Sequence, residues 1–187
     1  EFEMYYQAVV DIKTKKFVGT EALVRWNHQV RGVLTPIHFI NYIEEGGMSV
    51  DFGELVFKKV LQDIQIINSK LKNQDLKVSI NISPEHFFKY TFVKDIEVFC
   101  KDFSIDTKQI ELEILETSIM KNSEISKNKL DELHAKGFEI ALDDFGTGYS
   151  SLSYLKNFKV NKLKIDQSFI RDFLEDNNDK AIVQAVI

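Results

Sequence analysis

Short runs of apolar and β-branched residues alternate along the chain with longer segments in which apolar residues recur every three or four positions. The short runs predict strands at residues 4–10, 17–26, 77–82, 110–115, 139–143 and 162–165. The longer segments predict helices at residues 36–45, 52–71, 84–103, 123–136 and 179–187. This alternation favours an α/β fold, in which helices cover a mostly parallel sheet.

Local signals support several of these elements. The second helix has an amphipathic stripe at Phe52, Val56, Val60, Ile64, Ile67 and Leu71. Ser83 followed by Pro84 predicts a helix start, and Gly137 after Lys136 predicts a helix end. Only residues 11–16 connect the first two strands, so this pair should be antiparallel.

The composition indicates one globular domain that spans residues 1–187. The chain is 44% hydrophobic with only 2 prolines, and no linker or internal repeat divides it. An eight-stranded α/β barrel needs about 250 residues, so we expect a barrel that lacks its last strands and helices.

The charge of the chain limits its partners. The net charge is -5, which argues against binding of a DNA or RNA polymer but permits a small phosphate ligand neutralised by a metal ion. No membrane span or signal peptide is recognisable, so we expect a soluble cytoplasmic domain, or the cytoplasmic part of a membrane-bound protein. Cys100, the single cysteine, is interpreted as a buried structural thiol.

Polar side chains recur where the predicted strands end. They are Glu21, Arg25, Asn81, Glu113, Glu116, Asp143, Asp144, Lys164 and Asp166. The strand ends of a parallel barrel converge on one face, so these side chains can meet in one pocket. Carboxylate and amide oxygens suit hard divalent cations, and the four histidines lack the spacing of a zinc site. The pattern therefore predicts a divalent-metal site.

Each residue has a simpler interpretation when it is taken alone. Glu21 could pair with Arg25 or face solvent, Asn81 could be a turn residue, and Lys164 could be a surface lysine. Recurrence at successive strand ends favours the site, although these residues also permit a magnesium-assisted enolising barrel with a lysine base. The remaining strand charges are interpreted as solvated or barrel-wall residues: Glu111, Glu139 and Lys162.

Two motifs resemble the EAL domain family of bacterial second-messenger signalling. They are Glu21-Ala22-Leu23 within E-A-L-V-R, and the segment DDFGTGYSSLSYL at residues 143–155. Order and spacing also match at Tyr6-Gln7, at residues 81–83, at residues 113–116 and at residues 163–166. The resemblance covers essentially the whole chain and implies a modified TIM-type (β/α) barrel with one antiparallel strand near its start.

The resemblance implies hydrolysis of cyclic di-GMP to linear pGpG by a phosphodiesterase that uses two Mg²⁺ or Mn²⁺ ions. Metal ligands are implied at Glu21, Asn81, Glu113, Asp143 and Asp144. The implied catalytic residues are Lys164, which would hold the attacking water, and the metal ligands Glu21 and Asp143. Substrate contacts are implied at Arg25, at Gln7 toward guanine, and at Asp166.

The resemblance also implies an active-site and dimer loop at residues 145–151, anchored by Glu116. A homodimer and attached sensory or GGDEF domains are implied as well. Leu115 stands where the family has threonine, and the family's later A-E-G-V-E and Q-G-Y segments have no counterpart. In the family, the A-E-G-V-E segment supplies a glutamate that is proposed as general base and as a ligand of the second metal ion. The resemblance therefore implies that the 187-residue chain alone should be impaired or inactive. The alternative is a non-catalytic cyclic di-GMP receptor.

Overall fold

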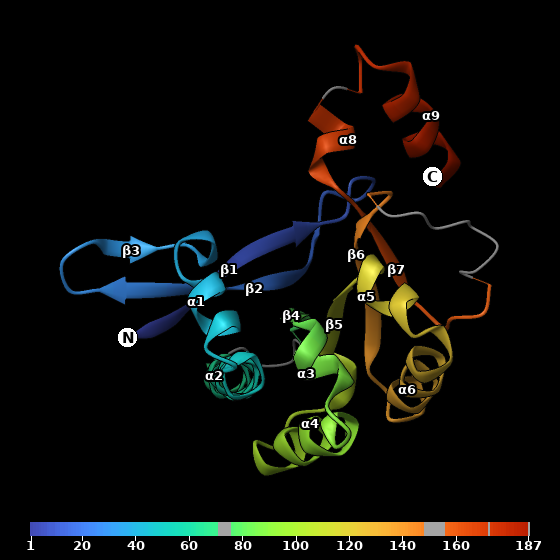
Figure 1. Cartoon of the computed structure of the whole chain (residues 1–187). Helices are drawn as coiled ribbons and strands as arrows, with labels where there is room; N and C mark the ends of the chain where they lie inside the picture. The colour runs from blue at the N-terminus through green and yellow to red at the C-terminus, as the bar shows by residue number, and fades with distance from the viewer. Residues whose placement is uncertain (71–75, 148–155, 172, 187) are drawn as a thin grey trace. The chain divides into compact units, whose positions relative to one another are not determined.

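The computed structural model describes residues 1–70, 76–147, 156–171 and 173–186. The chain divides into two compact units, Glu1–Leu112 and Glu113–Ile187. Figure 1 shows the helices and strands in chain order. Among the residues described, no helix combines the length and the apolar character that a membrane span requires.

The strands of the first unit begin with an antiparallel pair. Strand β1 (Phe2–Val10) pairs with β2 (Phe17–His28), and β3 (Gly32–Leu34) continues the antiparallel pairing on β2. Strand β4 (Val78–Ile82) is parallel to β2, and β5 (Ile110–Leu115) begins in this unit and ends in the second. The predicted antiparallel start is confirmed.

The part of the first unit that the structure describes contains six helical segments. They are η1 (Pro36–His38), α1 (Ile40–Glu45), α2 (Ser49–Lys70), α3 (Pro84–Phe88), α4 (Phe92–Asp102) and η2 (Thr107–Gln109). The Ser83 side chain accepts a hydrogen bond from the His86 N–H, with Pro84 at the first helical position, as predicted. The prediction of a single helix over residues 84–103 was wrong, because Lys89, with a φ of -53° and a ψ of 131°, leaves the helical conformation and separates α3 from α4.

The core of the first unit forms around α2. Val56, Val60 and Ile64 of the predicted stripe are buried, and Leu71 lies outside the described residues. Phe87, Phe92 and Cys100 from α3 and α4 are buried as well. Full burial of an aliphatic or phenylalanine side chain contributes about 1.5–3 kcal/mol, so this stripe is a principal source of the unit's stability.

The described residues of the second unit form a parallel strand pair and four helices. Strand β6 (Glu139–Phe145) pairs with β7 (Lys162–Ile165), and the helices are α5 (Glu116–Lys121), α6 (Ser123–Ala135), α8 (Gln167–Arg171) and α9 (Asn177–Val186). Helix α6 ends before Gly137, which has a φ of 91°, as the sequence predicted. Leu130, Leu133 and Phe138 are buried and fix α6 in place.

Candidate functional site

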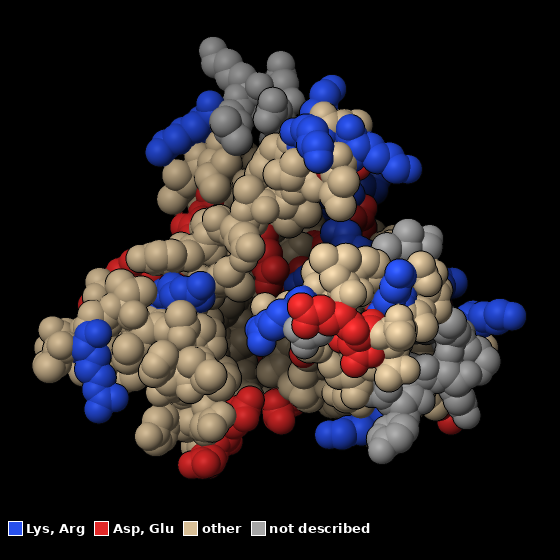
Figure 2. All heavy atoms as spheres, turned by 90° about the horizontal axis from the view of Figure 1, so that it is seen from above, with Lys and Arg blue, Asp and Glu red and all other residues tan. Residues whose placement is uncertain are grey.

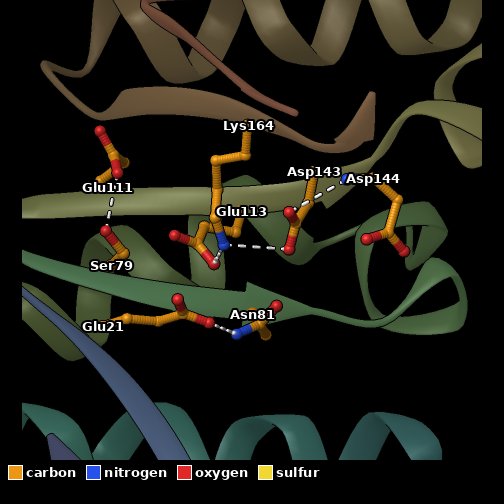
Figure 3. Close-up of polar contacts among 8 residues, drawn as sticks. All are labelled: Glu21, Ser79, Asn81, Glu111, Glu113, Asp143, Asp144 and Lys164. Atoms are coloured by element: carbon orange, nitrogen blue, oxygen red, sulfur yellow. Dashed lines mark hydrogen bonds and ion pairs between the residues drawn. The ribbon is translucent and has the colours of Figure 1, made fainter. Parts of the chain in front are cut away.

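A lysine and two carboxylates form the centre of the polar cluster in the second unit. Lys164 Nζ on β7 lies 2.5 Å from Glu113 Oε2 on β5 and 3.1 Å from Asp143 Oδ2 on β6 (Figure 3). The Glu113 side chain is only 2% exposed, whereas those of Lys164 and Asp143 are 25% and 20% exposed. The structure thus brings together three of the predicted site residues from three consecutive strands.

A β-bulge sets the direction of the two aspartates that end β6. Leu142 pairs with Leu163 and Phe145 pairs with Ile165, so β6 advances three residues while β7 advances two. Asp144 sits at this extra position with a φ of 53°, a left-handed conformation that aspartate tolerates better than most residues. Its N–H donates to Asp143 Oδ1 at 3.0 Å (Figure 3). The bulge interrupts the usual alternation of the strand at these two acids.

The two outer acids of this cluster have opposite pKa shifts. Burial, followed by the charges of Asp143 and Asp166, raises the pKa of Asp144, and Lys164 only partly offsets this. Hydrogen bonds from the Ser168 hydroxyl and N–H lower the pKa of Asp166. Asp144 therefore lies in a negative field that a bound cation would relieve.

Glu116 contacts the segment that follows the bulge. It is 1% exposed, and its Oε2 accepts a hydrogen bond of 2.8 Å from the Gly146 N–H. Gly146 has a φ of 101°, and a Cβ placed there would lie 2.9 Å from Phe169 Cε2. The first part of the predicted loop thus has a carboxylate contact on one side and a close aromatic contact on the other. Residues 148–151 of that loop lie outside the described residues.

In the first unit, Glu21 and Asn81 are direct partners. Asn81 Nδ2 donates to Glu21 Oε1 at 3.0 Å between β4 and β2 (Figure 3). Gln7 on β1 pairs directly with Glu21 in the antiparallel register, so their side chains share one face of the hairpin. Leu23 and Arg25 extend the same face of β2. The structure therefore brings Gln7, Glu21 and Asn81 together.

Arg25 has few protein contacts. Its Nη1 donates to the Val24 carbonyl oxygen at 2.8 Å, and its guanidinium carbon lies 5.7 Å from the centre of the Tyr5 ring. Glu3, which faces Arg25 across the strands, instead accepts from Asn27 Nδ2 at 3.0 Å. Among the described residues no carboxylate forms an ion pair with Arg25, so most of its donors can meet an anionic ligand.

A buried polar pair that the sequence pattern did not predict lies next to Glu21 in the sheet. Ser79 Oγ donates to Glu111 Oε1 at 2.7 Å, and the two residues are 6% and 4% exposed (Figure 3). The interpretation of Glu111 as a solvated residue was therefore wrong. Its alternative interpretation, as a barrel-wall residue, agrees with its burial. Ser79 is also the parallel register partner of Glu21. The shared parity of Glu111 with Glu113 on β5 could have indicated that they face the same side.

The candidate ligands are distributed between the two units, with Glu21 and Asn81 in the first and Glu113, Asp143 and Asp144 in the second. Within the described ranges, no group of three or more His, Cys, Asp or Glu side chains is close enough to hold a metal.

The exposed charges are of both signs. Figure 2 shows basic side chains in separate groups, with acidic side chains exposed as well.

Comparison with known proteins decides the family. The model of the EAL domain matches residues 1–187. The chain belongs to the EAL domain family. The bifunctional diguanylate cyclase/cyclic di-GMP phosphodiesterase MucR of Pseudomonas aeruginosa is 33% identical over 98% of this EAL domain and 27% of its own length. The cyclic di-GMP phosphodiesterase PdeR of Escherichia coli is 33% identical over 89% of the chain and 25% of its own length. This EAL domain thus spans about a quarter of these two relatives.

Solved structures confirm the fold. The PaMucR phosphodiesterase in complex with cyclic di-GMP matches with a TM-score of 0.93 and 33% identity, over 99% of this EAL domain and 74% of that chain. The EAL enzyme Bd1971 with cAMP and cyclic di-GMP bound matches with a TM-score of 0.92 and 36% identity, over 100% of this chain and 51% of that one. These likenesses confirm the α/β, TIM-like fold class, of which the 187 residues form an incomplete part.

Proposed function

We propose that this EAL domain, within the protein that contains it, hydrolyses cyclic di-GMP to linear pGpG. The observation that carries the proposal is Lys164 Nζ held between Glu113 and Asp143 at 2.5 and 3.1 Å. An ammonium held by two carboxylates keeps its charge and can orient a water molecule and an anionic phosphodiester. Relatives named as cyclic di-GMP phosphodiesterases, MucR and PdeR, support this assignment.

The donor set suits a pair of divalent cations, which we propose to be Mg²⁺ or Mn²⁺. Glu113, Asp143 and Asp144 would serve as ligands, and the family resemblance implies further ligands at Glu21 and Asn81; all offer the hard oxygen atoms that these ions prefer. Asp144 also lies close enough to Asp143 and Asp166 for their charges to add to the effect of burial in raising its pKa, and a bound cation would offset both effects. When bound, the ions would supply positive charge for the phosphodiester and acidify a water.

The other residues have proposed roles toward the substrate. Arg25 would bind a phosphate oxygen through donors that no carboxylate among the described residues occupies. Gln7 would donate to and accept from a guanine edge, since its amide offers both kinds of group. Asp166, which accepts hydrogen bonds from Ser168, would contribute a further substrate contact at the end of β7. We further propose a cytoplasmic location, a homodimer, and attached sensory or GGDEF domains.

The test is incubation of the longest natural protein containing this chain with cyclic di-GMP and Mg²⁺, followed by chromatography for pGpG. We expect product, and we expect Lys164→Met to lower kcat by at least about a hundredfold. Replacing Mg²⁺ by Ca²⁺ should suppress turnover while permitting binding, because Ca²⁺ favours a larger and looser coordination. Tight binding with no product under Mg²⁺ would identify a receptor instead. The absence of both binding and product would exclude both functions.

A further inference from the structure

The two faces of the β1–β2 hairpin differ in what covers them. On one face the Tyr6 hydroxyl donates to Asp63 Oδ2 of α2 at 2.6 Å, and the Phe2 ring lies 4.9 Å from the Phe52 ring. On the other face the register aligns Tyr5 with Leu23 and Gln7 with Glu21. Helix α2 therefore packs on the even-numbered side chains of β1, and the odd-numbered ones share the face that carries the candidate site.

Tyr5 is a large aromatic side chain on this second face. It is 46% exposed, and Arg25, which lies diagonally across the strand pair, places its guanidinium carbon 5.7 Å from the ring centre. An exposed tyrosine is common on protein surfaces and needs no function by itself. Here, however, the ring lies between a candidate phosphate-binding arginine and, two residues along β1, a candidate base-reading amide at Gln7.

We propose that the Tyr5 ring is a stacking platform for one guanine base of cyclic di-GMP; this inference rests on the proposed function. In a nucleotide, one ribose joins the base to the phosphate, so a ring that stacks the base must lie beside the group that binds the phosphate. Tyr5 and Arg25 have this arrangement. Stacking holds the base by its face, which leaves its edge accessible to the Gln7 amide. The cation over the ring strengthens the platform, because arginine planes and aromatic rings both stack with bases.

The binding experiment uses the longest natural protein containing this chain, with Ca²⁺ present so that the nucleotide is not consumed. Calorimetry should show that Tyr5→Ala raises the Kd for cyclic di-GMP about tenfold, as expected for the loss of one base–aromatic stack. Tyr5→Phe keeps the ring and should bind within about twofold of the unaltered protein. Tyr90→Ala is the matched control, since Tyr90 is 97% exposed in another part of the unit, and its Kd should not change.

A second ligand separates base stacking from an effect of the ring on Arg25. A cyclic analogue that keeps the sugar–phosphate ring but carries hydrogen in place of both guanines should bind Tyr5→Ala and the unaltered protein equally. Equal weakening for both ligands would mean that Tyr5 only orients Arg25, and the stacking proposal would be wrong. Unchanged binding of cyclic di-GMP by Tyr5→Ala would also overturn it, while leaving the proposed function intact. No binding by the unaltered protein would overturn both.

Discussion

The Glu116 carboxylate accepts a hydrogen bond of 2.8 Å from the backbone N–H of Gly146, thirty residues later in the chain. Glu116 begins α5, and Gly146 follows the strand that carries Asp143 and Asp144. The contact therefore ties the start of a helix to the backbone next to two candidate metal ligands.

Glu116→Ala should lower turnover of cyclic di-GMP and affinity for Mg²⁺ by about ten- to a hundredfold, the range seen when groups that orient metal ligands are removed. Steady-state kinetics over a Mg²⁺ titration would measure both. Glu116→Gln should recover part of the loss, because an amide oxygen can still accept from Gly146. The exposed Glu124 provides a matched control, and its alanine variant should behave as the unaltered protein. Unchanged metal affinity and turnover in Glu116→Ala would contradict the anchoring role.

Gly146→Ala should destabilise the protein by about 2–3 kcal/mol, because it combines backbone strain at a φ of 101° with a contact of 2.9 Å to Phe169. Urea unfolding would measure the loss. Gly32→Ala is the control: it has a φ of 72° but meets nothing within 4 Å, so only about 1 kcal/mol should be lost. The double change Gly146→Ala with Phe169→Leu should recover part of the difference, and equal losses for Gly146→Ala and Gly32→Ala would exclude the steric account.

Lys89 bridges two carboxylates, with Nζ at 2.6 Å from Glu54 Oε1 and 2.8 Å from Asp95 Oδ2. Burial raises the pKa of each acid, but hydrogen bonds and charge from Lys89 outweigh it and leave both pKa values below the usual range. The resulting stabilisation is complete above the unfolded-state pKa, near about 4, and is lost as the pH falls through the folded-state values. The same bonds raise the pKa of Lys89, so alkaline loss begins only at high pH.

Lys89→Met should therefore reduce the free energy of unfolding by about 1 kcal/mol at pH 7, and the difference should shrink steadily below about pH 4. Urea unfolding at a series of pH values would measure this. Lys101→Met removes a more exposed pair with Glu97, where the lysine side chain is 70% exposed, and it should change stability little. A Lys89→Met deficit that stayed constant from pH 7 to pH 3 would exclude the electrostatic explanation.

Ser79→Ala removes a donor from the buried Glu111 carboxylate and should cost about 1–2 kcal/mol of unfolding free energy. The control is Ser69→Ala, where the lost hydroxyl bond is to the Ile66 carbonyl on an exposed part of α2. Thermal and urea unfolding of both variants would give the comparison. A Ser79→Ala loss no larger than that of Ser69→Ala would show that the buried pair contributes little.

Cys100 should be unreactive in the folded protein. Its thiol is buried, and burial, with smaller contributions from Asp106 and Glu97, raises its pKa to about 12. Since the thiolate is the reactive form, a disulfide reagent at pH 8 should modify the folded protein only at its unfolding rate. The same reagent in 6 M urea should react at once; prompt reaction without denaturant would contradict the burial of Cys100.

Most elements of the fold were predictable because each carries a strong local signal. The stripe of α2, the Ser83 cap and the short link between β1 and β2 each depend on residues close together in sequence. The short elements β3, α5 and α8 were missed, since each is too brief to show a period. The break between α3 and α4 was missed because the residues between them, Lys89 to Thr91, include no proline or glycine to mark the end of a helix.

The types of residue at the site were predictable, but their contacts were not. Lys164, Glu113 and Asp143 come from three strands, and only the fold brings them together. The left-handed Asp144 gave no signal, because Asp-Asp before Phe-Gly also suits an ordinary turn. No role was predicted for Tyr5, which is one of two adjacent tyrosines. Because Tyr5 and Gln7 are two residues apart on one strand, the sequence could have placed them on the same face. The ligand set that would unite Glu21 with Glu113 and Asp143 stays a prediction.

The register of β1 against β2 means that the hairpin tolerates substitution better than any change in length. Deleting Tyr5 would exchange the two faces on one side of the gap: either Phe2 and Met4 would turn away from α2, or the Tyr6 hydroxyl would turn away from Asp63 and the Gln7 amide would face α2. Removing two residues would restore the alternation but shift every pair along the ladder. Engineers who wish to insert a tag or sensor near this end of the chain should therefore use the connecting turn at residues 11–16, outside the ladder.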